Sequence, residues 1–432
     1  MATCRFLILW VLATATATAQ TPPVRVQGER ISAHLQALSQ FGKNPQGGVS
    51  RVAYSDADVA GRAYVLGLMR EAGLSVQTDA AGNLVGRRDG TQPGLQPLLI
   101  GSHIDSVPEG GNYDGDVGAL AAIEVAQVLK DRGVTLRHPL EVIVFSNEEG
   151  VMLGSTALSH GIEAARLNLV SQSGKTVRAG VQLIGGDLQQ LAAAQRTPGS
   201  VAAYLELHIE QGAVLEQAAR QIGVVEGIVG IIDCEVTVQG FANHAGTTPM
   251  NQRHDALLAA ARFIEAVNQI VKATPGRQVG TVGWVRAEPG AYNVVPGKVV
   301  LGLEIRDLQA DKIRALYAEV VKQAEVIGQQ SGTTFQFEPH AMSEPALTDT
   351  HLQAVIAQSA QALQLSTLQL PSGAGHDAQE MAALGPIGMI FIPSVGGISH
   401  SPKEYSRPGD IENGANVLLE SLRRVDAEAP GP

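Results

Sequence analysis

Four short segments of this sequence each place metal-capable side chains directly after a run of apolar residues. The segments carry His103 and Asp105, Glu148 and Glu149, His208 and Glu210, and His400. Imidazole and carboxylate groups are the usual protein ligands of divalent metal ions when no thiolate is present. If the four segments meet in space, they therefore predict a metal site. Taken alone, the first segment is equally compatible with a polar turn that contains one buried histidine.

The apolar runs that precede these side chains have the length and composition of buried β-strands. They cover residues 98–103, 140–145, 202–207 and 386–392. In open α/β sheets, ligands bind at the carboxyl ends of the parallel strands. We therefore expect the four polar segments to converge at one edge of a sheet. Asp114 comes just before a predicted helix over residues 117–129, so it should lie beside them.

The expected cluster is too rich in ligands for a single tetrahedral zinc ion. Three histidines with two or three carboxylates suit two divalent ions that share one carboxylate. Zinc is favoured, with manganese or cobalt as alternatives. Asp105 is placed to hold the far ring nitrogen of His103. Of the adjacent pair Glu148 and Glu149, one can bind metal while the other takes a proton from the attacking water; the alternative, a pair of solvated acids, is disfavoured by the apolar run before it.

Composition and length limit the class of protein. The chain has 432 residues, enough for two domains, and its net charge of −11 argues against nucleic acid or an anionic membrane as the main partner. An apolar segment over residues 6–12 and a small-residue cleavage site at 17–19 predict a signal peptide over residues 1–19. We therefore expect an exported, periplasmic protein with no membrane attachment after cleavage.

The order of predicted elements indicates an inserted domain. Between residues 217 and 341 the pattern is β-α-β-β-α-β, the order of a ferredoxin-like unit. The flanking segments, residues 20–216 and 342–432, carry the metal-capable clusters and form one discontinuous catalytic domain. The expected fold class is α/β, with a mixed, mostly parallel sheet flanked by helices and an inserted ferredoxin-like α+β domain.

Seven motifs give the chain a family resemblance. Over residues 25–425 it resembles the binuclear-zinc amidohydrolases of the aminoacylase/carboxypeptidase superfamily, whose sheet is of the zinc-exopeptidase type. Within them it looks like the carbamoylase branch, which includes N-carbamoyl-L-amino acid hydrolase, β-ureidopropionase and allantoate amidohydrolase. The motifs are Gly-Ser-His-Ile-Asp-Ser-Val, Tyr-Asp-Gly, Asn-Glu-Glu-Gly, His-Ile-Glu-Gln-Gly, His-Ala-Gly-Thr-Thr-Pro-Met, Gly-Ala-Gly-His-Asp-Ala and Ser-His-Ser-Pro.

This resemblance implies roles for the clustered residues. One metal ion would be held by His103, Asp114 and His208, and the other by Asp114, Glu149 and His400, so that Asp114 bridges the two. Glu148 would be the general base and Asp105 would orient His103. The peptidase branches usually have a carboxylate at the position of His208, so histidine there favours the carbamoylase group.

The resemblance also implies substrate-binding residues. Arg306, at the end of a predicted strand, can bind a substrate carboxylate with its forked guanidinium; the alternative is a surface arginine paired with Asp307. Gln211 resembles the family's contact to the ureido or amide group, and the loop with Gly373 and His376 resembles a substrate loop. In the family, the histidine that matches His244 and the asparagine that matches Asn293 come from the partner subunit, and this histidine stabilises the developing oxyanion. The resemblance therefore implies a homodimer formed through the inserted domain, which is its dimerisation domain.

The leading hypothesis is hydrolysis of a C–N bond in an N-carbamoyl-L-amino acid or a related ureido acid such as β-ureidopropionate or allantoate. Carbamoyl substrates give ammonia, carbon dioxide and the free amino acid. One alternative is an N-acyl-amino acid hydrolase or dipeptidase on the same scaffold. Another is a non-catalytic, metal-dependent binding protein, which the presence of Glu148 disfavours. The chain departs from the family at residues 151–153, Val-Met-Leu, where the family usually has a small residue followed by Arg-Phe.

Overall fold

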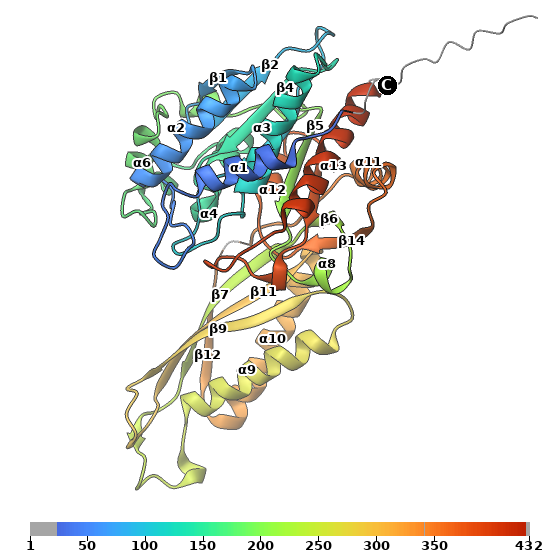
Figure 1. Cartoon of the computed structure of the whole chain (residues 1–432). Helices are drawn as coiled ribbons and strands as arrows, with labels where there is room; N and C mark the ends of the chain where they lie inside the picture. Colours follow the sequence, from blue (N-terminus) through green and yellow to red (C-terminus); the bar gives the residue numbers. More distant parts are fainter. Residues whose placement is uncertain (1–23, 341, 429–432) are drawn as a thin grey trace, which may run out of the picture.

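The computed structural model describes residues 24–340 and 342–428, which form two parts (Figure 1). The upper part in this view contains both ends of the described chain, and the lower part is formed by the middle of the sequence. The signal peptide predicted over residues 1–19 lies outside the described residues and stays a prediction. Within the described residues, no helix is both long enough and apolar enough to cross a membrane.

The upper part is built on a nine-stranded mixed sheet. Its strands are β1 (Ser75–Thr78), β2 (Leu84–Arg88), β3 (Leu98–His103), β4 (Leu140–Phe145), β5 (Ala203–Ile209), β6 (Ile222–Ile228), β13 (Ala346–Leu347), β14 (Thr367–Ser372) and β15 (Ile387–Ile392). The order is β1-β2-β4-β3-β5-β15-β6-β13, with β14 paired to β6. The central strands β4, β3, β5 and β15 are mutually parallel, as the sequence predicts.

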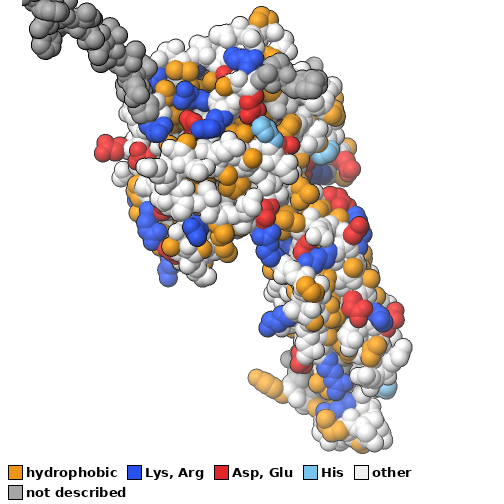
Figure 2. Space-filling model, turned by 90° about the vertical axis from the view of Figure 1, so that its right-hand side faces the viewer, with side chains coloured by type: hydrophobic (Ala, Val, Ile, Leu, Met, Phe, Trp, Pro, Cys, Tyr) orange, Lys and Arg blue, Asp and Glu red, His pale blue; other side chains and the backbone are white. Residues whose placement is uncertain are grey.

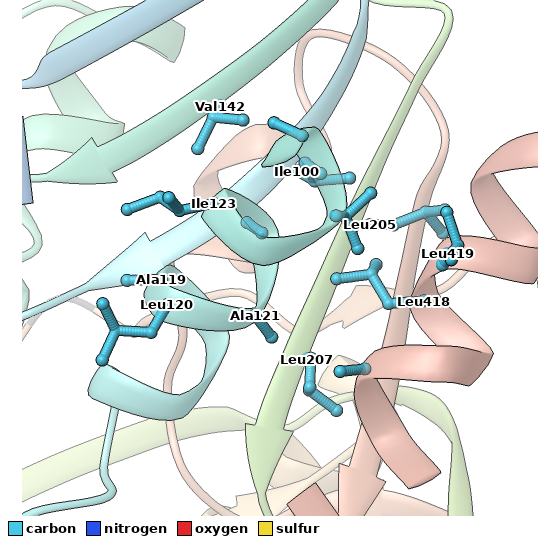
Figure 3. Packing of buried hydrophobic residues seen from close by; sticks show 14 of the residues in the cluster. Ile100, Ala119, Leu120, Ala121, Ile123, Val142, Leu205, Leu207, Leu418 and Leu419 are labelled. Atoms are coloured by element: carbon cyan, nitrogen blue, oxygen red, sulfur yellow. The ribbon is translucent and has the colours of Figure 1, made fainter. Parts of the chain in front are cut away.

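Helices cover this sheet. The longer ones are α1 (Gly28–Leu38), α2 (Asp56–Glu71), α3 (Asp116–Asp131), α11 (Thr350–Ala362) and α13 (Pro408–Ala427). The shorter ones are α4 (Glu148–Val151), α5 (Leu153–Ser159), α6 (Val177–Leu183), α7 (Leu191–Ala194), α8 (Val214–Gln217) and α12 (Asp377–Met381). Helix α3 is buried on almost every side because it packs on β3 and β5 and against α1 and α13, and its apolar residues belong to the same core cluster as Ile100, Leu205 and Leu418 (Figure 3). This packing fixes the start of α3, and with it Asp114.

The lower part is the inserted domain. Its elements are β7 (Gly230–Gln239), β8 (Asn243–His244), α9 (Ala256–Ala273), β9 (Val279–Glu288), β10 (Val294–Val295), β11 (Lys298–Asp307), α10 (Ala310–Ser331) and β12 (Thr334–Pro339). Strands β12-β7-β11-β9 form an antiparallel sheet, and α9 and α10 pack on one of its faces. The buried residues of β7 alternate along the strand, which is the period expected when one face is covered. The β-α-β-β-α-β order is confirmed.

The inserted domain begins later than the expected boundary at residue 217. Strand β6 pairs with β15 and β14 of the large sheet, and the chain changes sheets between Ile228 and Gly230. The sequence gives little sign of this division because β6 and β7 follow each other with only Val229 between them. Local patterning predicts a strand over residues 228–239, which is β7, but it does not separate β6 from it or say which sheet each one joins.

Candidate metal centre

The four predicted clusters lie at the carboxyl ends of four neighbouring parallel strands. His103 ends β3, Glu148 and Glu149 begin α4 directly after β4, and His208 lies near the end of β5. His400 follows β15 in the loop that leads to α13. Because β4, β3, β5 and β15 are adjacent in that order, their ends present these side chains to one edge of the sheet. The predicted convergence is therefore present.

The first group that could hold a metal ion contains His103, Asp114 and His208, and all three are buried. One ligand atom from each lies within 4.8 Å of those of the others. The Nε2 atom of His208 lies 3.1 Å from Asp114 Oδ1, and the Nε2 atom of His103 lies 3.7 Å from the same oxygen. This is the first set of residues that the family resemblance implies.

The second group contains Asp114, Glu149 and His400, and its ligand atoms also lie within 4.8 Å of one another. His400 Nε2 lies 3.2 Å from Asp114 Oδ2 and 3.6 Å from Glu149 Oε2. Asp114 thus turns one oxygen toward each group, the geometry of a bridging carboxylate. The His400 ring is about half exposed, so the cluster is open to solvent on this side.

Backbone carbonyls fix the histidine tautomers. His103 Nδ1 donates to the backbone oxygen of Asp105 at 3.0 Å, and His208 Nδ1 donates to the backbone oxygen of Ile209 at 2.9 Å. The backbone N–H of Gly115 points at His208 Nε2, at 3.3 Å. Each ring therefore turns its Nε2 atom toward Asp114, the orientation that metal-binding histidines use.

The structure gives the Asp105 carboxylate a different role from the one expected. Its oxygen lies 3.8 Å from His103 Nδ1, beyond hydrogen-bond distance, while its two oxygens accept the backbone N–H groups of Glu148 and Glu149 at 3.2 Å each. Asp105 therefore orients His103 through its backbone and holds the start of α4 through its side chain.

The buried acids provide a test of whether the residues present fit a divalent cation. Burial and the charge of Asp114 raise the pKa of Glu149 to about 8. Burial and the charge of Asp377 hold the pKa of Glu148 well above its usual range. Glu149 Oε1 has no hydrogen-bond partner among the described residues. Crowded carboxylates with an unsatisfied oxygen, beside two imidazoles that turn Nε2 toward Asp114, form a donor set that divalent cations would stabilise.

Three further residues complete the edge of the cluster. Gln211 Nε2 donates to Asp114 Oδ2 at 2.7 Å, which brings the predicted substrate-binding amide into the site. Ser399 Oγ lies 3.1 Å from the same oxygen and 2.8 Å from Glu404 Oε2. Ser399 and Glu404 were not among the candidate residues from the sequence. Ser399 is the first residue of the Ser-His-Ser-Pro motif, and the only sequence signal for Glu404 is its proximity to His400.

Arg306 and Gly373 also come together. Strand β11 ends beside the upper part, and Arg306 Nη1 donates to the backbone oxygen of Gly373 at 2.6 Å. Arg306 Nε and Nη2 donate to the two oxygens of Glu304 at 2.7 and 2.8 Å, so its acidic partner is Glu304 and not the expected alternative, Asp307. These contacts use three of the five guanidinium N–H groups and leave one on Nη1 and one on Nη2 for another acceptor.

Two residues of the expected site lie behind it. His376 is buried, its ring centroid is 4.5 Å from that of His208, and its Nε2 lies 2.8 Å from Ser372 Oγ. Burial next to His208 lowers the pKa of His376 well below its usual value. Glu210 is a helix cap, since its carboxylate accepts the backbone N–H groups of the first turn of α8. His376 therefore packs against a candidate ligand rather than facing solvent, and Glu210 belongs to neither group.

Residues 151–153, where the sequence differs from the family, lie close to the loop that contains Gly373 and His376. Met152 adopts a positive φ of 46° between α4 and α5. A Cβ atom added at Gly375 would lie 3.6 Å from the Met152 methyl carbon. The side chain at this altered position thus faces the loop that carries Gly373 and would contact a larger residue at position 375.

His244 and Asn293 lie far from the cluster within one chain. Strand β8, which contains His244, pairs with β10, and the backbone N–H of Ala245 donates to Asn293 oxygen at 2.9 Å. Both follow the far ends of strands β7 and β9. Strand β7 leaves the upper part at Gly230, and nine residues at about 3.3 Å each place Gln239 about 30 Å away. The structure brings His244 and Asn293 together but not to the cluster of their own chain.

Comparison with known proteins agrees with this fold. The profile of the family described as Peptidase family M20/M25/M40 matches residues 99–424, and the chain belongs to this family. The chain is 40% identical over 402 residues to an N-carbamoyl-L-amino acid amidohydrolase of Geobacillus stearothermophilus, a match that covers 92% of this chain and 98% of that one.

Two further relatives lie in the same branch. A ureidoglycolate hydrolase of Arabidopsis thaliana is 37% identical over 407 residues, which cover 91% of this chain and 86% of that one. Among solved structures, an amidase of the hydantoinase/carbamoylase family from Burkholderia multivorans has a TM-score of 0.85 and 34% identity, and covers 94% of this chain and 100% of that one. The resemblance to the carbamoylase branch is confirmed.

Proposed function

We propose that this protein is a two-metal amidohydrolase that cleaves the C–N bond of an N-carbamoyl-L-amino acid or a related ureido acid. The observation that carries the proposal is the pair of metal-capable groups that share Asp114 at the end of the parallel strands. Relatives named for carbamoyl-amino acid and ureidoglycolate hydrolysis support the substrate class. Zinc is the proposed metal, with manganese and cobalt as alternatives.

The proposed roles follow from position. When bound, two divalent cations supply Lewis-acid polarisation of the substrate carbonyl and a water of lowered pKa. His103 and His208 bind on one side of Asp114, and Glu149 and His400 on the other. Glu148, whose Oε2 lies 3.7 Å from His103 Nε2, belongs to neither group and is free to accept a proton from the attacking water. It then returns this proton to the leaving nitrogen.

Substrate recognition is proposed to involve both parts of the molecule. The two remaining N–H groups of Arg306 can bind the substrate carboxylate, since Glu304 and the backbone of Gly373 hold its other donors. Gln211 lies beside Asp114 and can contact the ureido group. In this proposal, bound substrate contacts both Arg306 of the inserted domain and the metal edge of the large sheet.

A homodimer would complete the site. His244 and Asn293 are too far from the cluster of their own chain, so we propose that they act on the partner's substrate, where His244 donates to the developing oxyanion. Two features of the inserted domain support association. Strand β9 is an edge strand of its sheet, and Figure 2 shows hydrophobic side chains at the free end of this domain. The exposed apolar residues there include Phe241, Met250 and Tyr292.

A substrate panel tests the proposed reaction. We expect the metal-loaded protein to release product from carbamoyl-amino acids, β-ureidopropionate or allantoate faster than from acetyl-amino acids or dipeptides. Zinc, manganese and cobalt are compared in parallel. Higher kcat/KM on acetyl-amino acids would decide for the acylase alternative. Binding of ureido acids without product release, with metal fully loaded, would decide for a non-catalytic binding protein.

Mixed dimers test the contribution of His244 from the partner. A chain with Glu148→Gln is co-expressed with a differently tagged chain with His244→Ala. In this heterodimer one active site has both an intact Glu148 and an intact partner histidine, so we expect about half of wild-type activity, while each parent homodimer is nearly inactive. In the control heterodimer, one chain carries both changes and the other is wild type, and activity should be lost. Equal activity of the two heterodimers would contradict action in trans.

A further inference from the structure

Glu404 connects two loops that come from opposite ends of the large domain's sequence. It lies four residues after His400, in the loop between β15 and α13, and its side chain is buried. Its Oε1 atom accepts the backbone N–H groups of Tyr113 and Asp114, at 2.9 and 3.0 Å. These two residues belong to the loop between β3 and α3. One carboxylate oxygen thus holds the backbone of the shared ligand candidate.

The other oxygen of Glu404 points back to its own loop. Oε2 lies 2.8 Å from Ser399 Oγ, the hydroxyl next to His400, and the same hydroxyl is 3.1 Å from Asp114 Oδ2. The contacts therefore form a closed ring. It runs from the Asp114 backbone to Glu404, from Glu404 to Ser399, and from Ser399 back to the Asp114 carboxylate. It fixes the Asp114 carboxylate relative to the residue that precedes His400.

Gly111 provides the space for this carboxylate. A Cβ atom at Gly111 would stand 2.1 Å from Glu404 Oε1 and 2.4 Å from Glu404 Cβ. Because Gly111 does not have a positive φ, an alanine would suit the backbone and would only collide with Glu404. The backbone at Gly111 is therefore shaped to seat the Glu404 side chain against the Asp114 loop.

We infer that Glu404 is a positioning residue that sets the separation of Asp114 and His400 and thereby forms the second metal site. This inference rests on the proposed two-ion function. In the first group, His103 and His208 lie on strands β3 and β5 and are held by backbone contacts, so only Asp114 among its three residues lies in a loop. In the second group, Asp114 lies in the loop between β3 and α3, and His400 lies in the loop between β15 and α13. Glu404 and Ser399 connect these two loops by their contacts to Asp114.

The test is the affinity of each ion, measured by titrating the zinc-loaded full-length protein with a chelator and counting zinc per chain by elemental analysis. We expect wild type to release two ions in two steps. Glu404→Ala should weaken the second-site ion by about 10- to 100-fold and leave the first in place, which is the usual cost of losing a residue that orients metal ligands. Glu404→Gln should keep the second ion, because its amide can still accept the backbone N–H groups and contact Ser399.

Two further variants separate positioning from a general structural effect. Gly111→Ala should displace Glu404 and weaken the same ion, and the double variant Gly111→Ala with Glu404→Ala should be no worse than Glu404→Ala alone. Glu210→Ala is the matched control, since it also removes a carboxylate that accepts two backbone N–H groups, but at α8. We expect it to release zinc as wild type does.

The possible results are distinct. If Glu404→Ala releases its two ions at the same chelator concentrations as wild type, the inference is overturned. It is also overturned if the Glu404 and Glu210 variants both bind the two ions more weakly and to the same extent. If Glu404→Ala fails to fold, Gly111→Ala decides, because it keeps every side chain of the cluster. Wild-type protein that binds one zinc ion or none would overturn the two-ion function as well, so failure of the inference alone is recognised by wild type holding two.

Discussion

Glu148→Gln should lower kcat by about 10³-fold or more while the protein keeps its metal. The substitution removes the proton acceptor but preserves size, and general bases of this kind contribute about 10²- to 10⁴-fold. Glu148 is in neither metal-capable group, so its replacement leaves both donor sets unchanged. The measurement is kcat on the best carbamoyl or ureido substrate, with metal content determined on the same sample.

The neighbouring glutamate provides the control. Glu149→Gln changes the same chemistry one residue away, but Glu149 is a member of the second group, so this variant should lose one metal ion as well as activity. The two variants therefore separate the proposed base from the proposed ligand. Turnover of Glu148→Gln within tenfold of wild type would contradict its assignment as the general base.

Arg51→Met should destabilise the protein by about 3–5 kcal/mol, the cost of removing one partner from a buried ion pair. The guanidinium is fully buried and pairs with both oxygens of Asp116, at 2.7 and 2.5 Å. Its other N–H groups donate to the backbone oxygens of Leu38, Phe41 and Ile104. A methionine would leave the Asp116 carboxylate and three carbonyl groups without these partners.

Chemical denaturation of wild type and variant measures this effect. The control is Arg314→Met, since the ion pairs of Arg314 with Asp311 and Glu344 are exposed and should contribute about 0–1 kcal/mol. Because Asp116 begins α3 directly after the Asp114 loop, we also expect Arg51→Met to bind zinc more weakly. An Arg51 variant as stable as the Arg314 variant would show that the buried pair contributes little.

Much of the site could be predicted because most of its candidate ligands lie at or directly after the ends of strands. An apolar run followed by a histidine or an acid is visible in the sequence, and parallel pairing of β4, β3, β5 and β15 brings the four ends together. The two groups that share Asp114 agree with the ligand sets that the family motifs imply. The inserted β-α-β-β-α-β unit was predictable for a similar reason, since the period of its apolar residues matches its elements.

The rest depends on contacts that sequence patterns do not encode. The Asp105 carboxylate binds the start of α4, which lies over forty residues away, so its partner cannot be found from the spacing to His103. Glu404 bonds to a loop 290 residues earlier. The burial of His376 behind His208 follows from how α12 packs on the sheet. Likewise, β6 joins the large sheet because of its pairing with β15 and β14, which its own residues do not specify.

The proposed hydrolytic mechanism depends most directly on where the cations bind. Crystals of the zinc-loaded protein, measured at the zinc absorption edge, should give two anomalous peaks per chain about 3.5–4 Å apart, one on each side of the Asp114 carboxylate. His103 and His208 should contact one peak, and Glu149 and His400 the other. A single peak, or peaks that Asp114 does not touch, would contradict the two-ion site and the hydrolytic mechanism proposed from it.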